Sequence, residues 1–318
     1  MVSSQMAPRA LSGVVLTCSP PKAEGANRFN MKRSYYLVTT DHLEEQIWFR
    51  DDADFKTGMN HVAATTAESG MDVLAFILMS NHVHFVLSCS SRDEALLFIN
   101  AFKHRYSIYY HCRHGIRKAL NDNAVDIREI GLKPESLEKA VAYVVMNCVA
   151  ARICTFANDY RWGSGSCYFR HTPVGGKPVA AFSARKRYAL LSSKTTIPSE
   201  WQITEEGYIL PDSYVQVTGV ERLFRTPGRL SYFLNHSSKA KAVLDSGITN
   251  LPSFKDQTLV ALVQDLCQSL YHQSSPKSIS DEEKKDLLHQ LRRRTGSDPK
   301  QLMRVLGLSY ETVVDWLE

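Results

Sequence analysis

Two histidines interrupt one of the most apolar stretches of the chain, and their placement constrains the fold more than any other feature. Asn81-His82-Val83-His84 lies between the apolar runs 73–79 and 85–87. Successive side chains of a β-strand alternate between faces, so His82 and His84 would project to one side while Val83 enters the core on the other. Two imidazoles on one face of a strand are a candidate metal-binding pair.

The residues around this pair predict alternating strands and helices. Expected strands cover 31–40, 73–79, 82–88 and 124–130, and the turn-prone Ser80-Asn81 joins the middle two into a hairpin. Apolar residues at helical spacing from Phe55 predict a helix that ends at Gly70. A second helix is expected from Arg92 to about Cys112, with Ser91 as its N-cap, and a third opens near Pro134.

The order of these elements predicts the fold class. The succession β-α-β-β-α-β-α is typical of a ferredoxin-like α+β sandwich, an antiparallel sheet with helices on one face. The other face of the sheet is then open, and the histidines are expected to lie on it.

The third helix carries a candidate nucleophile. Residues 137–153 have a helical pattern that puts Tyr143 and Asn147, four positions apart, on one stripe. Lys139 lies one turn earlier on that stripe, where a cation would favour the phenolate form of Tyr143. On the residues alone, ordinary alternatives stay open: a surface histidine pair, an aromatic ring that closes the edge of the core, and a solvated lysine.

Four motifs stand in order along the chain. They are Leu-Met-Ser-Asn-His-Val-His-Phe-Val-Leu at 78–87, Tyr-His-Cys-Arg-His-Gly at 110–115, Tyr-Val-Val-Met-Asn-Cys-Val at 143–149 and Asp-Tyr-Arg-Trp-Gly-Ser at 159–164. Together they resemble a known family, the REP-associated tyrosine transposases, which are single-tyrosine HUH endonucleases. The resemblance covers the chain from about Arg33 to Phe169. One position departs from it, since the family usually has a proline after the asparagine, where this chain has Cys148.

The resemblance implies an activity. It implies that His82 and His84 bind a divalent metal, Mg²⁺ or Mn²⁺, and that Asn147 completes the metal site. Tyr143 would attack a DNA phosphate and form a 5′-phosphotyrosine link, so that the enzyme nicks and rejoins single-stranded or hairpin DNA, as a monomer or homodimer. Two rival functions stay open: a domesticated DNA-binding regulator that does not cleave, and a metallohydrolase that uses a metal-bound water.

Basic residues suggest where DNA would bind. Three cations of the second helix, Lys103, Arg105 and Arg113, are interleaved with tyrosines, a mixture that suits single-stranded DNA. The alternative is an amphipathic helix that buries its aromatic rings and solvates its charges.

The last forty residues have the helix lengths and turn residues of a helix-turn-helix. Helices are expected at 281–294, 299–306 and 310–317, with a turn at Gly307-Leu308-Ser309. Basic side chains would contact duplex or hairpin DNA, although the acidic last helix keeps a protein-interaction module open. The basic residues are Arg292, Arg293, Arg294, Lys300 and Arg304.

These motifs divide the chain into four expected parts. Residues 1–30, rich in small and polar residues, are expected to be a disordered extension, and Met31 is an alternative start. The transposase domain covers 31–172, an accessory region of unknown role covers 173–276, and the helix-turn-helix-like module covers 277–318.

Composition bounds the cellular setting. The 318 residues are 44% hydrophobic, with a mild net charge of +5 that would not by itself indicate a nucleic-acid partner. Seven cysteines without a CxxC pair favour reduced thiols in a cytoplasm, and the family resemblance implies that the cytoplasm is bacterial. No apolar run approaches the roughly 20 residues of a membrane span, so no membrane partner is expected.

Overall fold

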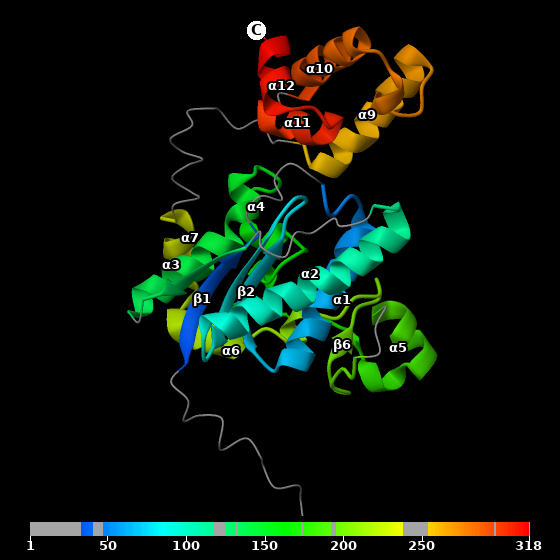
Figure 1. Ribbon diagram of the computed structural model, residues 1–318. Coiled ribbons are helices and arrows are strands. Elements are labelled where there is room, and N and C mark those ends of the chain that lie inside the picture. Colours follow the sequence, from blue (N-terminus) through cyan, green and yellow to red (C-terminus); the bar gives the residue numbers. More distant parts are fainter. Residues whose placement is uncertain are drawn as a thin grey trace, which may run out of the picture. The chain divides into compact units, whose positions relative to one another are not determined.

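The computed structural model describes residues 33–40, 47–116, 125–131, 133–172, 174–191, 195–237, 254–295 and 297–317. The expected extension, residues 1–30, and Met31 lie outside the described residues. The first part of the fold is built from seven elements. They are β1 (Ser34–Thr39), α1 (Asp52–Ser69), β2 (Asp72–Leu78), β3 (Val83–Cys89), α2 (Arg92–His114), β4 (Asp126–Ile130) and α3 (Pro134–Val145) (Figure 1).

These strands form the predicted four-stranded sheet. Its order is β2-β3-β1-β4, and each neighbouring pair is antiparallel. The register places Thr39 of β1 opposite His84 of β3. An antiparallel sheet of this order with helices between the strands is the ferredoxin-like arrangement, so the predicted α+β class is confirmed.

Local sequence fixes the ends of the first two helices. The Asp51 side chain accepts hydrogen bonds from the first turn of α1, and Gly70 ends that helix in the left-handed conformation. Ser91 caps α2 through the amide of Glu94, and Gly115 ends α2 in the same way as Gly70 ends α1. The Ser91 cap and the end of α1 at Gly70 agree with the prediction, α2 runs two residues past its expected end near Cys112, and the Asp51 cap was not predicted.

Helices cover both faces of the sheet, so the expectation of helices on one face is wrong. Phe85 of β3 lies edge-on to Phe98 and Phe102 of α2, whereas the neighbouring His84 lies edge-on to Tyr143 of α3. Consecutive strand residues point to opposite faces, so α2 and α3 must lie on opposite sides. The physical reason is that every residue of β3 is buried, and the apolar side chains of the second face also need cover.

The chain after α3 extends the edge of the sheet. The backbone amide of Leu78 donates to the carbonyl of Trp162, and the amide of Ser164 donates to the carbonyl of Phe76. Trp162 is buried and stacks on Phe55, as expected for a residue that packs the domain edge. The segment in between, Gly163, bridges directly to Ile77.

Short elements follow this edge. They are α4 (Asn147–Ala150), η3 (Ala157–Asp159), η4 (Gly165–Cys167), β5 (Lys177–Pro178), η5 (Val179–Ala181), α5 (Ala184–Leu191), β6 (Gln202–Ile203), η6 (Pro211–Ser213), α6 (Val217–Phe224) and α7 (Pro227–Asn235). Strands β5 and β6 pair with each other, and α6 and α7 pack against α3. The cysteines that the structure describes are all unbridged.

The last helices form a bundle with its own apolar core, which we call the C-terminal bundle. It consists of α9 (Asp256–Tyr271), η7 (Pro276–Ser278), α10 (Asp281–Thr295), α11 (Pro299–Leu306) and α12 (Tyr310–Leu317). The predicted ends of α11 and α12 are confirmed. Helix α9 shares the core of α10, α11 and α12, so this packed unit begins at Asp256, before the predicted boundary at residue 277. The helix-turn-helix itself stays a prediction.

Gly163 provides a test of the sheet edge. A Cβ atom at this position would lie 2.8 Å from the carbonyl oxygen of Phe76 and 3.2 Å from the Cα atom of Ile77. We expect Gly163→Ala to lower the free energy of unfolding by about 1–3 kcal/mol, because the backbone at Phe76 and Ile77 would have to move to make room for the methyl group. Urea unfolding measures this. Gly228→Ala, with open space around it, is the control, and equal stability of the two variants would contradict the close edge packing.

Candidate active site

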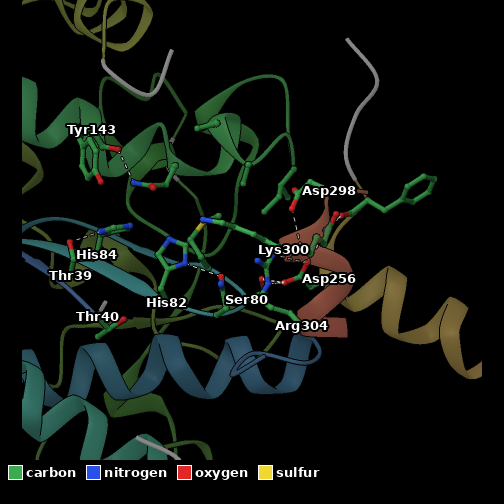
Figure 2. Close-up of a pocket in the computed structure, with 18 residues that line it drawn as sticks. Thr39, Thr40, Ser80, His82, His84, Tyr143, Asp256, Asp298, Lys300 and Arg304 are labelled. Atoms are coloured by element: carbon green, nitrogen blue, oxygen red, sulfur yellow. Dashed lines mark hydrogen bonds and ion pairs between the residues drawn. The ribbon is translucent and has the colours of Figure 1, made fainter. Parts of the chain in front are cut away.

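A cavity of about 550 Å³ gathers Tyr143 and the three predicted metal ligands, His82, His84 and Asn147 (Figure 2). One side is formed by the ends of β1 and β3, the hairpin turn and the helices α3 and α4. The other side is formed by the C-terminal bundle. The residues used below are Thr39, Ser80, Asn81, His82, His84, Tyr143, Asn147, Asp256, Asp298, Lys300, Gln301 and Arg304.

The histidine pair is held in place through one nitrogen of each ring. The ring centroids of His82 and His84 are 4.8 Å apart. Nδ1 of His82 lies 2.8 Å from Oδ1 of Asn81, and Nδ1 of His84 lies 2.8 Å from Oγ1 of Thr39. Such a contact at Nδ1 fixes the orientation of an imidazole and makes Nε2 the nitrogen that would bind a metal ion. The two imidazoles therefore lie side by side as predicted, although β3 begins only at Val83, and their metal-binding role stays a prediction.

Tyr143 lies beside this pair. Its ring is half-buried and edge-on to the His84 ring, with centroids 5.6 Å apart and an interplanar angle of 84°. The tyrosine comes from α3, which the apolar residues of its other face hold against the sheet. A phenol, two imidazoles and a carboxamide thus meet in one cavity.

Asn147 joins the group by ending α3. Its Nδ2 donates to the backbone carbonyls of Tyr143 at 2.8 Å and Val144 at 3.2 Å. The single helix predicted over 137–153 is therefore wrong. The helix is interrupted at Met146, and α4 starts at Asn147. The reason is that the side-chain amide of Asn147 donates hydrogen bonds to backbone carbonyls at the end of α3. With its nitrogen engaged, the Asn147 side chain offers Oδ1 to a cation.

Lys139 does not reach the cavity. Its side chain is 69% exposed, and its Nζ lies 3.7 Å from a carboxylate oxygen of Glu135 one turn earlier. The helical stripe was too coarse a guide, since Tyr143 is half-buried and lines the cavity whereas Lys139 is exposed and does not. The structure therefore gives no support to a catalytic role for this lysine.

The predicted DNA-binding cations of α2 have contacts within the protein; the burial of Lys103 is against its predicted role, while the DNA contacts of Arg105 and Arg113 stay a prediction. Lys103 is only 1% exposed. Arg105 pairs with Glu68, and Arg113 pairs with the carboxylates of Asp51 and Asp54. Helix α2 buries most of its aromatic rings, as in the amphipathic-helix alternative, but these three cations are buried or paired within the protein and not solvated as that alternative expected.

The tyrosines of α2 do not compete with Tyr143. The hydroxyls of Tyr106 and Tyr110 donate to the carbonyls of Trp48 and Ile47, and Tyr109 donates to Asp54. Burial raises the pKa of Tyr106 well above its usual value and also raises the pKa of Tyr109 and Tyr110. Each phenol is thus held in its neutral form, away from the cavity.

The five predicted cations of the bundle separate into two groups. Arg292 donates to the carbonyl of Ser297, and Arg293 and Arg294 are exposed on α10, away from the cavity lining. Lys300 and Arg304 of α11 line the cavity that contains the histidine pair. The structure thus brings two of the five to the candidate active site.

A buried carboxylate joins the two sides of the cavity. Asp256 is 3% exposed and accepts hydrogen bonds from Ser80 Oγ at 2.7 Å and Gln301 Nε2 at 2.8 Å. The Nε atom of Arg304 lies 3.3 Å from the same carboxylate. Ser80 belongs to the turn before the histidines, so this network links that turn to the bundle (Figure 2).

Sequence reasoning missed three residues that shape this site. Thr39 and Asn81 were placed only as strand end and turn, and Asp256 lies in a region to which no chemistry was assigned. Thr39 could have been found from the strand register, which puts it opposite His84. Asp256 gave no local signal, because its partners are about 45 and 176 positions away along the chain.

Comparison with known proteins finds similarity to transposases, and the family match includes the histidine pair but ends before Tyr143 and Asn147. Residues 31–125 match the family described as "Transposase IS200 like". A solved structure of a REP-associated tyrosine transposase bound to a REP hairpin is 10% identical, with a TM-score of 0.35, and the alignment covers 42% of this chain and 77% of that one. No curated protein matches the chain. The family match confirms the resemblance to the tyrosine transposases, while the fold rests on the strand order and register described above.

Among the described residues, no helix is both long and apolar enough to cross a bilayer. In the same residues, no group of three or more His, Cys, Asp or Glu side chains is placed to hold a metal ion.

Asp256 offers a test of the junction between the bundle and the hairpin turn. We expect Asp256→Asn to lower the free energy of unfolding by about 1–3 kcal/mol, because a buried carboxylate that faces Arg304 and accepts several hydrogen bonds is lost. Urea unfolding and faster hydrogen exchange at residues 80–82 would report it. Asp265→Asn, on an exposed part of α9, is the matched control, and identical behaviour of the two variants would contradict this role.

Proposed function

We propose that this protein is a metal-dependent DNA nicking and joining enzyme of the tyrosine transposase type. The observation that carries the proposal is the meeting of Tyr143, His82, His84 and Asn147 in one cavity. The match of residues 31–125 to the IS200-like transposases supports the same class. The proposed partner is single-stranded or hairpin DNA.

The donor set fits a divalent metal. Asn81 and Thr39 hold the Nδ1 sides of the two histidines, and Asn147 offers an amide oxygen beside them. Two imidazoles and one amide oxygen leave coordination sites for phosphate oxygens, which suits Mn²⁺ or Mg²⁺. A metal ion bound there would neutralise charge on the non-bridging oxygens of a phosphate.

Tyr143 supplies the nucleophile in the proposed reaction. Its phenolic oxygen forms a bond to phosphorus, and the bond from phosphorus to the 3′ oxygen breaks. The phenol loses one proton and the departing 3′ oxygen gains one, so the product is a 5′-phosphotyrosine and a free 3′-hydroxyl. The reverse step, with the 3′-hydroxyl of another end, rejoins DNA and needs no ATP.

Two rival functions make different predictions at Tyr143. A metallohydrolase with a metal-bound water would cleave DNA without any covalent protein–DNA species. A domesticated regulator would bind DNA and leave it intact. The half-buried position of Tyr143 against His84 favours the covalent route over both, because it places the phenol next to the proposed metal ligands.

The first test concerns Tyr143 itself. We expect Tyr143→Phe to abolish cleavage and the covalent adduct while DNA affinity and the thermal midpoint change little, because the ring still packs against His84. Incubation with 5′-labelled and 3′-labelled hairpin oligonucleotides and Mn²⁺, followed by denaturing gels, measures this. Tyr109→Phe is the control that should keep the adduct. Normal adduct formation by Tyr143→Phe would refute the assignment.

The second test concerns the metal ligands. His84→Ala should reduce metal-dependent cleavage at least about 100-fold and spare most DNA affinity, because the metal stabilises transition-state charge more than it holds the DNA. Thr39→Val, which removes the hydrogen-bonding hydroxyl next to Nδ1 of His84, should weaken Mn²⁺ binding by about 10-fold to 100-fold.

Titration calorimetry with Mn²⁺ and cleavage rates provide the two measurements. His104→Ala, which removes an exposed histidine of α2 outside this cavity, is the matched control. Unchanged cleavage by His84→Ala would exclude the proposed metal site.

A further inference from the structure

The C-terminal bundle contributes its own wall to the candidate active site. Five residues from its α9 and α11 region line the cavity that holds Tyr143 and the histidine pair. They are Asp256, Asp298, Lys300, Gln301 and Arg304. A module that merely held duplex DNA at a distance would not need to place side chains there.

We propose that Lys300, supported by Arg304, binds a backbone phosphate of the DNA strand next to the phosphate that Tyr143 attacks. This inference rests on the proposed function and deepens it, because it assigns the substrate contact on the second wall of the same site. It also gives the bundle a role in single-strand binding at the active site.

The charged lining residues are two cations and two carboxylates, of which Asp256 pairs with Arg304 and Asp298 caps α11. Among the described residues that line the cavity, Lys300 and Arg304 are the two with lysine or arginine side chains. A DNA strand that enters the cavity brings one negative charge with each phosphate, and the proposed metal site serves only the scissile phosphate. A neighbouring phosphate needs a second cation, and α11 provides it.

The two cations differ in what they already contact. Arg304 pairs with the buried carboxylate of Asp256, so part of its charge is offset within the protein. Lys300 is exposed, and within the described residues it forms no salt bridge. Lys300 is therefore the side chain that can give its full charge to a phosphate, and Arg304 adds to the local potential.

The position of Lys300 is fixed from both sides of its helix turn. Asp298 caps α11 by accepting from the backbone amide of Gln301 at 3.0 Å. The Gln301 side chain donates to Asp256, which in turn accepts from Ser80 in the hairpin turn. Lys300 lies between these two anchors, and Arg304 follows four positions later on the same side of α11.

The same network connects the phosphate contact to the proposed metal ligands. Ser80 lies two positions before His82, and its backbone carbonyl accepts from the amides of Trp48 and Phe49. The turn is thus held by the core on one side and by Asp256 on the other. These contacts fix the distance between the two cations, Lys300 and Arg304, and the histidine pair. A DNA strand in the cavity would therefore contact both groups at once.

Binding measured without chemistry tests this proposal. In the Tyr143→Phe background of the full chain, Lys300→Gln should weaken binding of a single-stranded oligonucleotide about tenfold and reduce the salt slope of log Kd by about one. Lys285→Gln, the same change at an exposed site of α10 outside the cavity, is the control and should change affinity less than about twofold. Thermal unfolding verifies that both variants are folded.

A scan with neutral phosphates locates the contact. A single methylphosphonate is moved along the oligonucleotide one position at a time. At one position next to the scissile phosphate, the protein with Lys300 and the Lys300→Gln variant should bind equally, because the charge that Lys300 contacts is gone.

Equal affinity of Lys300→Gln and Lys285→Gln, or an affinity loss that no methylphosphonate position cancels, would overturn the inference. These measurements do not depend on covalent chemistry. If the protein with Tyr143 forms an adduct while Lys300→Gln binds normally, only this inference fails. If no adduct forms at all, the proposed function fails, and the binding result for Lys300 still stands by itself.

Discussion

The pairing of β3 with β1 is the constraint on which the rest of the candidate site depends. Its register places Thr39 opposite His84, and the contact between their side chains orients the imidazole. The next residue of the same strand, Phe85, points to the opposite face and packs against α2. Alternating side chains of β3 therefore form the core on the α2 side and the site on the α3 side. A shift of one residue in this register would exchange the two.

Closure of the histidine face by α3 gives the site its chemistry. An open sheet face would leave two solvated imidazoles, whereas the observed helix brings Tyr143 and Asn147 against them. The C-terminal bundle adds a second wall, and the buried carboxylate of Asp256 joins it to the turn before His82. The site is thus assembled from distant segments, and the bond between Ser80 and Asp256 alone spans 176 positions of sequence.

Local signals predicted most of the fold. Apolar periodicity together with caps such as Ser91 and Gly70 located the helices to within a few residues, since these signals act over one or two turns. The histidine pair was predictable for the same reason. Contacts between distant segments were not, because nothing near Asp256 marks its partners and nothing near Lys103 marks its burial.

The most direct test of the central claim is the site of covalent attachment. Protein incubated with a single-stranded oligonucleotide and Mn²⁺ is digested with nuclease and trypsin, and the peptides are mapped by mass spectrometry. The account predicts a nucleotide joined through a phosphate to Tyr143. Attachment at another tyrosine, or DNA cleavage without any modified peptide, would contradict it.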